Sequence, residues 1–232
     1  MPPWAPRADW RFSMRKSNNA DSLALLPPSA LIRTGPVDHA DWNYRPLIGS
    51  VQRVRFQLIR RLLGSARFDR LLEIGYGSGV FMPELAKRAG ELYGIDPHPM
   101  PRQVEDVLRK HGVHATLATA SAEALPYADG YFDCAVSVSA IEYVDDIDRA
   151  CMELTRVLRP GGIVVVATPG ASPLWDLALR ISTGENPQQY ADRRQRLLPA
   201  LKRHFDVQDE IAVPPFGGRL MRLYTGVRLA RR

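Results

Sequence analysis

The sequence predicts an α/β fold in which a seven-stranded, mostly parallel sheet has helices on both faces and an antiparallel C-terminal hairpin. Three observations carry this prediction. Short apolar segments alternate with segments of helical periodicity between residues 46 and 170. The short segments are continuously apolar, which is typical of strands buried on both faces. Beyond residue 170 the order changes to helices followed by a strand, a turn and a strand.

The first predicted element is a helix that begins at Pro46 and ends before Gly64. Its apolar residues recur every three or four positions: Leu47, Val51, Val54, Leu58 and Leu62. Gly64 stands where a glycine commonly follows a helix. The spacing then predicts strands over 70–75, 91–96 and 113–117, separated by helices over 80–89 and 99–110.

The second half continues the alternation and then departs from it. A strand is predicted over 132–138, a helix over 145–158 and a strand over 163–167, after the turn Arg159-Pro-Gly-Gly162. Helices over 172–181 and 191–204 precede strands over 205–213 and 220–229. Because crossovers between parallel strands are right-handed, the alternating part forms one parallel sheet covered on both faces.

Charge divides the 232 residues into a basic start, an acidic middle and a basic end, although the net charge is only +6. Residues 1–35 carry five basic and two acidic side chains, and residues 193–232 carry ten and three. The middle has a net charge of −4, so it is not a nucleic-acid-binding surface and no nucleic-acid partner is expected. The proline-rich residues 1–45 read as an arm, partly disordered or folded as a lid, before a single domain over 46–232.

Two cysteines, Cys134 and Cys151, lie within apolar and helical segments, and they form no metal-ligand spacing with the histidines. We therefore expect buried thiols, no metal site and a reducing, cytoplasmic setting. The sequence has no run of 18 apolar residues and no apolar segment after its first arginines. A transmembrane segment and a secretory signal are accordingly not expected.

Glycines at alternate positions follow the first predicted strand, in Leu72-Glu-Ile-Gly-Tyr-Gly-Ser-Gly79. Such spacing allows a sharp turn and a close approach of a ligand to the backbone. A dinucleotide fingerprint would need a third glycine at Val80 or Met82, and no Lys-Ser/Thr pair follows for a phosphate-binding loop. The acidic Glu73 favours a ligand that carries an amine over a pyrophosphate.

The segment Glu73-x-Gly75-x-Gly77-x-Gly79 resembles motif I of the class I S-adenosylmethionine-dependent methyltransferases, particularly the type 11 small-molecule group. The resemblance covers about residues 71–170. It implies a Rossmann-like fold, S-adenosylmethionine as cofactor and methyl transfer to an O, N or C nucleophile of a small molecule. It also implies these cofactor-binding residues: Glu73, Gly75, Tyr76, Gly77, Gly79, Asp96, Pro97, Ser121, Ala122, Glu123, Val138 and Ser139.

Within this set, the resemblance gives Glu73 the methionine amine and Asp96 the ribose hydroxyls. Residues 121–126 resemble the loop that flanks adenine, but Ser121 replaces the family's usual aspartate. Glu123 is either a ligand or a residue that starts a helix.

The resemblance leaves the catalytic residues open. Many relatives have two histidines after the fourth strand, where this chain has Glu142-Tyr143. Glu142 is either a general base or a solvent-facing carboxylate near a helix start. Tyr143 is expected to line the pocket. His39 either covers the substrate or packs on the first helix.

The acceptor and the assembly state are also open. Residues 36–46 and 170–195 are expected to define the acceptor, and Trp175, Leu177 and Leu179 favour an apolar or amphipathic molecule. Two alternatives share parts of the pattern. A protein that binds S-adenosylmethionine without transferring its methyl group would share every motif. A nicotinamide-dependent oxidoreductase would share only the sheet and Asp96.

Overall fold

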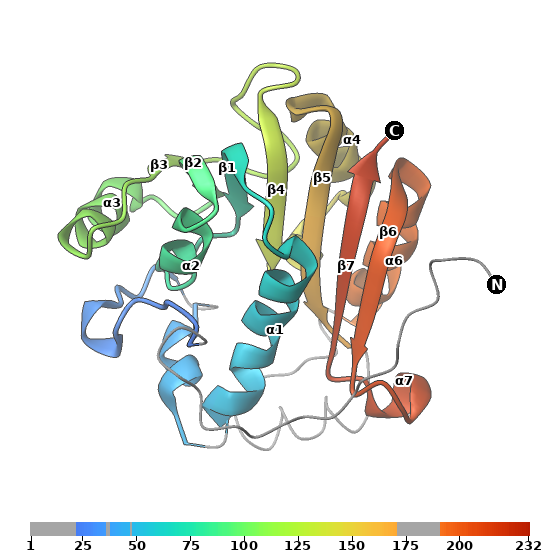
Figure 1. Cartoon of the computed structure of the whole chain (residues 1–232), viewed down its shortest axis with the longest axis horizontal. Helices are drawn as coiled ribbons and strands as arrows, with labels where there is room; N and C mark the ends of the chain where they lie inside the picture. The colour runs from blue at the N-terminus through green and yellow to red at the C-terminus, as the bar shows by residue number, and fades with distance from the viewer. Residues whose placement is uncertain (1–21, 36–37, 47, 171–190) are drawn as a thin grey trace.

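A computed structural model describes residues 22–35, 38–46, 48–170 and 191–232. Seven strands form one sheet in the order β3-β2-β1-β4-β5-β7-β6 (Figure 1). Their bounds are β1 (Phe68–Ile74), β2 (Ala89–Asp96), β3 (Thr116–Thr119), β4 (Phe132–Val138), β5 (Leu158–Pro169), β6 (Phe205–Val213) and β7 (Tyr224–Arg231). The predicted seven-stranded fold class is confirmed.

Only β7 runs antiparallel within the sheet. Strands β1 to β5 pair in parallel, with Leu71 opposite Cys134 and Val136 opposite Val165. Strand β7 pairs antiparallel with β5 on one side and with β6 on the other. The C-terminal hairpin therefore exists, but its second strand lies inside the sheet and its first strand forms the edge.

The helices cover both faces. They are α1 (Ile48–Leu63), α2 (Met82–Ala86), α3 (Pro101–Lys110), α4 (Ile147–Val157), α6 (Ala191–His204) and α7 (Gly218–Met221), with 3-10 turns η2 (Pro28–Ala30), η3 (Ala40–Tyr44) and η4 (Ile141–Tyr143). Helices α1, α2 and α3 share one apolar core with the sheet, in which Phe56 stacks on Phe81. Helices α4 and α6 form the core of the opposite face, and Figure 1 shows the two layers.

Several boundaries differ from the prediction for local reasons. Helix α2 is shorter than the predicted 80–89 because Phe68 N–H already pairs with Arg88 O as β2 begins. Strand β3 starts at Thr116, since Val113 N–H bonds Leu108 O and closes α3. The turn after Arg159 lies within β5, where the pairing with β4 shifts register. The predicted helix over 172–181 lies outside the described residues.

The described part of the N-terminal arm packs against the start of α2. Leu26 is buried, and its N–H donates to Val80 O at 3.1 Å. Ala24 N–H donates to Glu84 Oε2 at 2.9 Å. Residues 22–35 are thereby held beside the glycine-rich segment, while the division into an arm and a single domain stays a prediction. Within the described ranges, no helix is long and apolar enough to cross a membrane.

Candidate active site

Buried polar atoms without hydrogen-bond partners gather at the carboxyl edge of the sheet, where β1, β4 and β5 end together. Among the described residues, those that we assign to this edge are Glu73 Oε2, Tyr76 OH, Ser78 Oγ, Ser139 Oγ, Thr168 Oγ1 and both carboxylate oxygens of Glu142, and five further atoms of this kind belong to Tyr127 and to arginine side chains. Burying a polar group without a partner is costly, so native structures leave few of them. Their concentration at one edge indicates a site that a polar ligand completes.

The glycine loop after β1 requires glycine for two reasons. Gly75, Gly77 and Gly79 have φ values of +76°, +50° and +75°, in the left-handed region that favours glycine. A Cβ on Gly75 would also lie 2.1 Å from the Cβ of Ala140. The loop therefore presents bare backbone at the end of β1 and lies directly against the segment that follows β4.

Glu73 points its carboxylate into this edge. Its side chain is 3% exposed, and none of the described residues donates a hydrogen bond to Oε2. Burial, followed by the nearby Asp96 charge, raises the pKa of Glu73 well above its ordinary value. A cation placed beside Glu73 would relieve both effects. The buried carboxylate is thus suited to an amine-bearing ligand.

Asp96, at the end of β2, holds the glycine loop in place. Its Oδ2 accepts a hydrogen bond from Gly77 N–H at 2.9 Å, and its Oδ1 accepts one from His98 N–H at 3.2 Å. A carboxylate has about four lone-pair sites, so each oxygen keeps a site for a further donor. The arrangement allows Asp96 to bind two adjacent hydroxyl groups without releasing the loop.

His98 fixes the same loop from the other side, and sequence reasoning missed it. Its Nδ1 accepts a hydrogen bond from Met100 N–H at 3.1 Å, so the ring proton resides on Nε2 and donates to Gly77 O at 3.0 Å. Its ring also meets the Tyr76 ring edge-on at 4.9 Å. The only available signal was its position two residues after Asp96.

Asp38 is a second residue that the sequence did not single out. It accepts hydrogen bonds from Thr34 N–H, Thr34 Oγ1 and Ala40 N–H. A Cβ on Gly77 would lie 3.6 Å from its Oδ1. The chain before α1 therefore brings another carboxylate over the glycine loop, so Asp38, Glu73 and Asp96 give this half of the edge a negative potential.

The loop expected beside adenine is tied to α4. Ser121 Oγ donates to Glu123 Oε2 at 3.0 Å, while Glu123 Oε1 accepts from Asp146 N–H at 2.6 Å. The Glu123 carboxylate thus contacts the backbone at the start of α4, and no helix begins at Glu123 itself. Ala122 is buried, whereas Pro97 and Ser121 are exposed.

Val138 and Ser139 lie where β4 leaves the sheet. Val138 pairs with Ala167 and is buried. Ser139 has φ +53°, an uncommon value for a residue other than glycine, and its N–H donates to Ala167 O at 2.8 Å. This backbone turn directs the following residues back across the edge toward the glycine loop.

The three candidate catalytic residues lie in different environments. Glu142 is 1% exposed, so the expectation of a solvent-facing carboxylate is wrong; η4 turns its side chain inward under α6. Burial raises the pKa of Glu142 to about 7. Tyr143 is 42% exposed, and its backbone O accepts from Arg193. The His39 ring stacks on Trp42 at 4.0 Å, immediately before α1.

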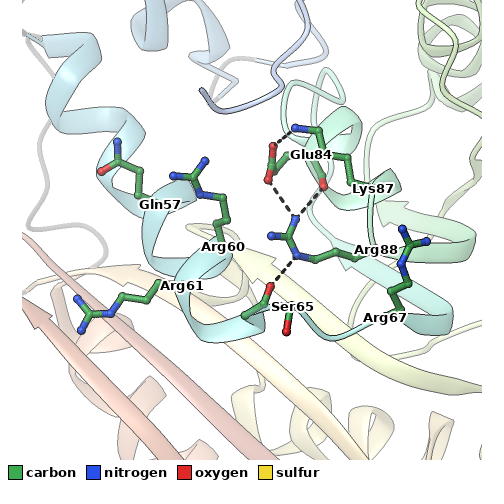
Figure 2. Close-up of a pocket in the computed structure, with 9 residues that line it drawn as sticks. Gln57, Arg60, Arg61, Ser65, Arg67, Glu84, Lys87 and Arg88 are labelled. Carbon is green, nitrogen blue, oxygen red and sulfur yellow. Dashed lines mark hydrogen bonds and ion pairs between the residues drawn. The ribbon is translucent and has the colours of Figure 1, made fainter. Parts of the chain in front are cut away.

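A large surface pocket lies at the opposite edge of the sheet. Its volume is 820 Å³, and its lining comes from the end of α1, the segment before β1 and the end of α2 (Figure 2). Its basic side chains are Arg60, Arg61, Arg67, Lys87 and Arg88, of which Lys87 and Arg88 pair with Glu84. Because these residues precede β1 and β2, the pocket is remote from the glycine loop and does not form part of the candidate site.

The described residues contain no group of three or more His, Cys, Asp or Glu side chains able to hold a metal ion. Cys134 and Cys151 are both buried and unbridged.

A family model described as a methyltransferase domain matches residues 72–166. The chain is 33% identical over 132 residues to the malonyl-acyl-carrier-protein O-methyltransferase of Geobacter sulfurreducens, covering 55% of this chain and 49% of that protein. Among solved structures, it is similar to the N-methyltransferase NodS of Bradyrhizobium japonicum in complex with S-adenosyl-L-homocysteine, with a TM-score of 0.61, 18% identity and coverage of 86% and 94%. It is also similar to the cyclase SpnF, with a TM-score of 0.56, 20% identity and coverage of 78% and 80%.

These likenesses differ in what they establish. The chain spans about half the length of the Geobacter relative and less of two others, 26% of a biotin biosynthesis bifunctional protein from Cellvibrio japonicus and 37% of an uncharacterized methyltransferase from a Mycobacterium species. At 18% and 20% identity, the structural likenesses concern the fold alone. The family match instead covers the glycine loop and Asp96. Residues 72–166 are therefore similar to a methyltransferase domain.

Proposed function

We propose that the chain transfers the methyl group of S-adenosylmethionine to an O, N or C nucleophile of a small molecule. The observation that carries this proposal is the buried Glu73 carboxylate, whose Oε2 accepts no hydrogen bond from the described residues and which faces the Asp96 charge. An α-ammonium group supplies both the missing donors and the missing positive charge. A dinucleotide pyrophosphate in the same place would add negative charge to an edge that is already negative.

The residues present fit the nucleoside as well as its amine. Asp96 would hold the two ribose hydroxyls through the acceptor sites that Gly77 and His98 leave available. The glycine loop offers backbone without Cβ atoms, and the buried Ala122 would offer its N–H near the adenine ring. Ser139 Oγ, which accepts no hydrogen bond from the described residues, would be available on the methionine side.

When bound, S-adenosylmethionine supplies a methyl group that its sulfonium charge has already activated. The protein's own contribution is then to hold the acceptor in line and to exclude water. Orientation of this kind is worth roughly 7–11 kcal/mol in favourable cases. A general base is needed only when the nucleophile must lose a proton.

For the acceptor we propose a small, amphipathic molecule. The Geobacter relative is named as a malonyl-acyl-carrier-protein O-methyltransferase, which supports a small acyl group as the acceptor. The apolar side of the proposal rests on Trp175, Leu177 and Leu179, which lie outside the described residues. We also propose a reducing, cytoplasmic setting, because the buried thiols of Cys134 and Cys151 are unbridged.

Calorimetric titration of the full chain with S-adenosylhomocysteine tests the cofactor assignment. We expect saturable binding, and Asp96→Asn should weaken it about 10- to 100-fold because a carboxylate that accepts hydroxyl donors is lost. Asp106→Asn is the matched control, since Asp106 is an exposed residue of α3 that pairs with Arg109. Binding of NAD without binding of S-adenosylhomocysteine would replace the proposal with the oxidoreductase alternative.

A second candidate is a protein that binds S-adenosylmethionine without transferring its methyl group. The likeness to SpnF favours keeping it, because that protein is a [4+2]-cyclase by name. Incubation with methyl-labelled S-adenosylmethionine and a metabolite extract separates the two. Label in a small-molecule product supports transfer, whereas tight binding with no labelled product supports the binding protein.

A further inference from the structure

His98 is a buried histidine that contacts the glycine loop, although the nucleoside assignment above makes no use of its side chain. It lies in the turn between β2 and α3, two residues after Asp96, and it is 8% exposed. A neutral imidazole has one ring nitrogen that donates and one that accepts, and a buried ring needs a partner for each. The partners of the two nitrogens therefore show what this side chain does.

The start of α3 determines which ring nitrogen carries the proton. Met100, the residue that precedes α3, donates from its backbone N–H to His98 Nδ1 at 3.1 Å. A backbone N–H can only donate, so Nδ1 is the acceptor and the proton of the neutral ring lies on Nε2. The ring thus has a single donor, and its direction is fixed by α3.

This single donor points at the glycine loop. His98 Nε2 lies 3.0 Å from Gly77 O. On the other side of the same glycine, Asp96 Oδ2 accepts a hydrogen bond from Gly77 N–H at 2.9 Å. The two peptide groups that flank Gly77 are therefore held separately, one by Asp96 and one by His98.

Gly77 needs this support because a glycine loses more conformational freedom on ordering than any other residue. It adopts φ +50°, and it has no side chain whose packing could hold that conformation. A loop that is already ordered before a ligand arrives does not incur the entropy of ordering when the ligand binds. The hydrogen bond from His98 can therefore raise ligand affinity without any contact between the imidazole and the ligand.

His98 also links the loop to the carboxylate of Asp96. The backbone N–H of His98 donates to Asp96 Oδ1 at 3.2 Å, and Thr119 Oγ1 donates to His98 O at 2.9 Å. The His98 ring meets the Tyr76 ring edge-on, with 4.9 Å between the centroids. One residue thus orients the carboxylate assigned to the ribose and the loop beside it, as a supporting residue of a pre-organised site does.

From these contacts we infer that His98 is a positioning residue for the nucleoside. Its neutral imidazole holds Gly77 O and keeps the glycine loop in the conformation that binds S-adenosylmethionine. The inference rests on the proposed function and adds to it a residue that acts through the loop. A histidine that served only the start of α3 would act through Nδ1 and Met100 instead.

Two substitutions separate the roles of the two ring nitrogens. In His98→Gln the amide nitrogen can replace Nε2 and donate to Gly77 O, whereas in His98→Asn the amide oxygen can replace Nδ1 and accept from Met100 N–H. Calorimetry with S-adenosylhomocysteine should give a Kd about tenfold higher in His98→Asn and within about threefold of the wild type in His98→Gln. The reverse order, or wild-type affinity in His98→Asn, would overturn the inference.

His114→Asn is the matched control, because His114 is an exposed residue just before β3, at the opposite edge of the sheet. We expect this variant to bind S-adenosylhomocysteine as the wild type does. A loss as large as that in His98→Asn would show that the effect is not specific to the loop, and the inference would be wrong.

Amide hydrogen exchange of the unliganded chain gives a second measurement that does not depend on a ligand. The N–H groups of Gly77 and Gly79 should exchange about tenfold faster in His98→Asn than in His98→Gln, because the loop opens more often once Gly77 O has lost its donor. Equal exchange rates in the two variants would contradict the inference.

The affinity of the wild-type chain keeps this test separate from the test of the proposed function. If the wild type binds S-adenosylhomocysteine and His98→Asn binds it equally well, only the role of His98 is wrong. If the wild type does not bind the nucleoside, the proposed function fails and the inference fails with it.

Discussion

The chain buries two glutamates at the ends of adjacent strands, and their surroundings are opposite. Glu73, at the end of β1, faces the negative charge of Asp96. Glu142, just after β4, faces the positive charges of Arg194 and Arg55. Burial raises the pKa of both carboxyl groups. The carboxyl group of Glu73 thus lies near a negative charge, whereas that of Glu142 lies near two positive charges.

This difference divides one edge of the sheet into two halves with different chemistry. The glycine-loop half is negative and suits a ligand with an amine. The half around Glu142 lies near the positive charges of Arg194 and Arg55. The following changes test that division, beginning with the largest expected effect.

We expect Gly75→Ala to destabilise the protein through a steric clash between the glycine loop and the segment that follows β4. The new Cβ would lie 2.1 Å from the Cβ of Ala140, at a backbone φ of +76°. Strain and overpacking together predict a loss of about 3 kcal/mol or more in the free energy of unfolding, measured by urea denaturation. Gly64→Ala is the control, since Gly64 has φ +61° but open space around it. Equal losses in the two variants would show that the contact with Ala140 is unimportant.

We expect Glu73→Gln to affect stability and ligand binding in different ways at the glycine-loop half of the edge. The amide removes a buried charge beside Asp96, so we expect Tm of the free protein to rise or stay constant. Binding of S-adenosylhomocysteine should weaken about 10-fold or more, because the amine loses its carboxylate. Thermal melts and calorimetry on the same samples measure both effects. A variant that binds as tightly as the wild type would remove Glu73 from the site.

We expect Glu142→Gln to change how the free energy of unfolding depends on pH, because it removes the buried carboxyl group beside η4. A carboxyl whose pKa is raised from 4.5 to about 7 in the folded chain makes the native state less stable as pH rises through that window. We expect the variant to exceed the wild type by up to roughly 2–3 kcal/mol at pH 8, estimated from the size of the shift. The difference should disappear near pH 4.5. If the free energy of unfolding changed with pH in the same way for both proteins, the Glu142 carboxyl group would not be buried as the structure has it.

Glu153 lies outside both halves of this edge. We expect the stability of Glu153→Gln relative to the wild type to depend on pH in the opposite direction. Glu153 accepts hydrogen bonds from Arg156 and from Leu125 N–H, and these hold its pKa at about 2. Its contribution is complete above pH 4.5 and is lost as pH falls toward 2. The variant should be less stable by about 1 kcal/mol at pH 7, and the gap should close in acid. If the stability difference between the two proteins persisted at low pH, its cause would be packing and not the charge of Glu153.

The sequence predicted more of the residues around the glycine loop than of those around Glu142. The glycine loop, Glu73 and Asp96 lie within 24 consecutive residues, so their spacing is readable along the chain. His98 and Asp38 were not predicted. They lie against the backbone of the loop, and such contacts leave no recognisable pattern in the sequence.

The burial of Glu142 could not be read in the same way. It involves α6, which packs against η4 and lies far from Glu142 in the sequence. Between Ile141 and Asp145 the local composition is that of an exposed helix start. The packing of α6 against η4 is a contact that this composition does not record.

The position of β7 makes the order of synthesis matter. This strand follows β6 in the sequence, yet it lies between β5 and β6. Until the ribosome has released residues 224–231, β6 has no partner, and the flank of β5 stays open to water and to other chains. The nascent protein must therefore keep an incomplete sheet from aggregating, and deletion of residues 224–231 would detach two strands instead of one, because β6 joins the sheet only through β7.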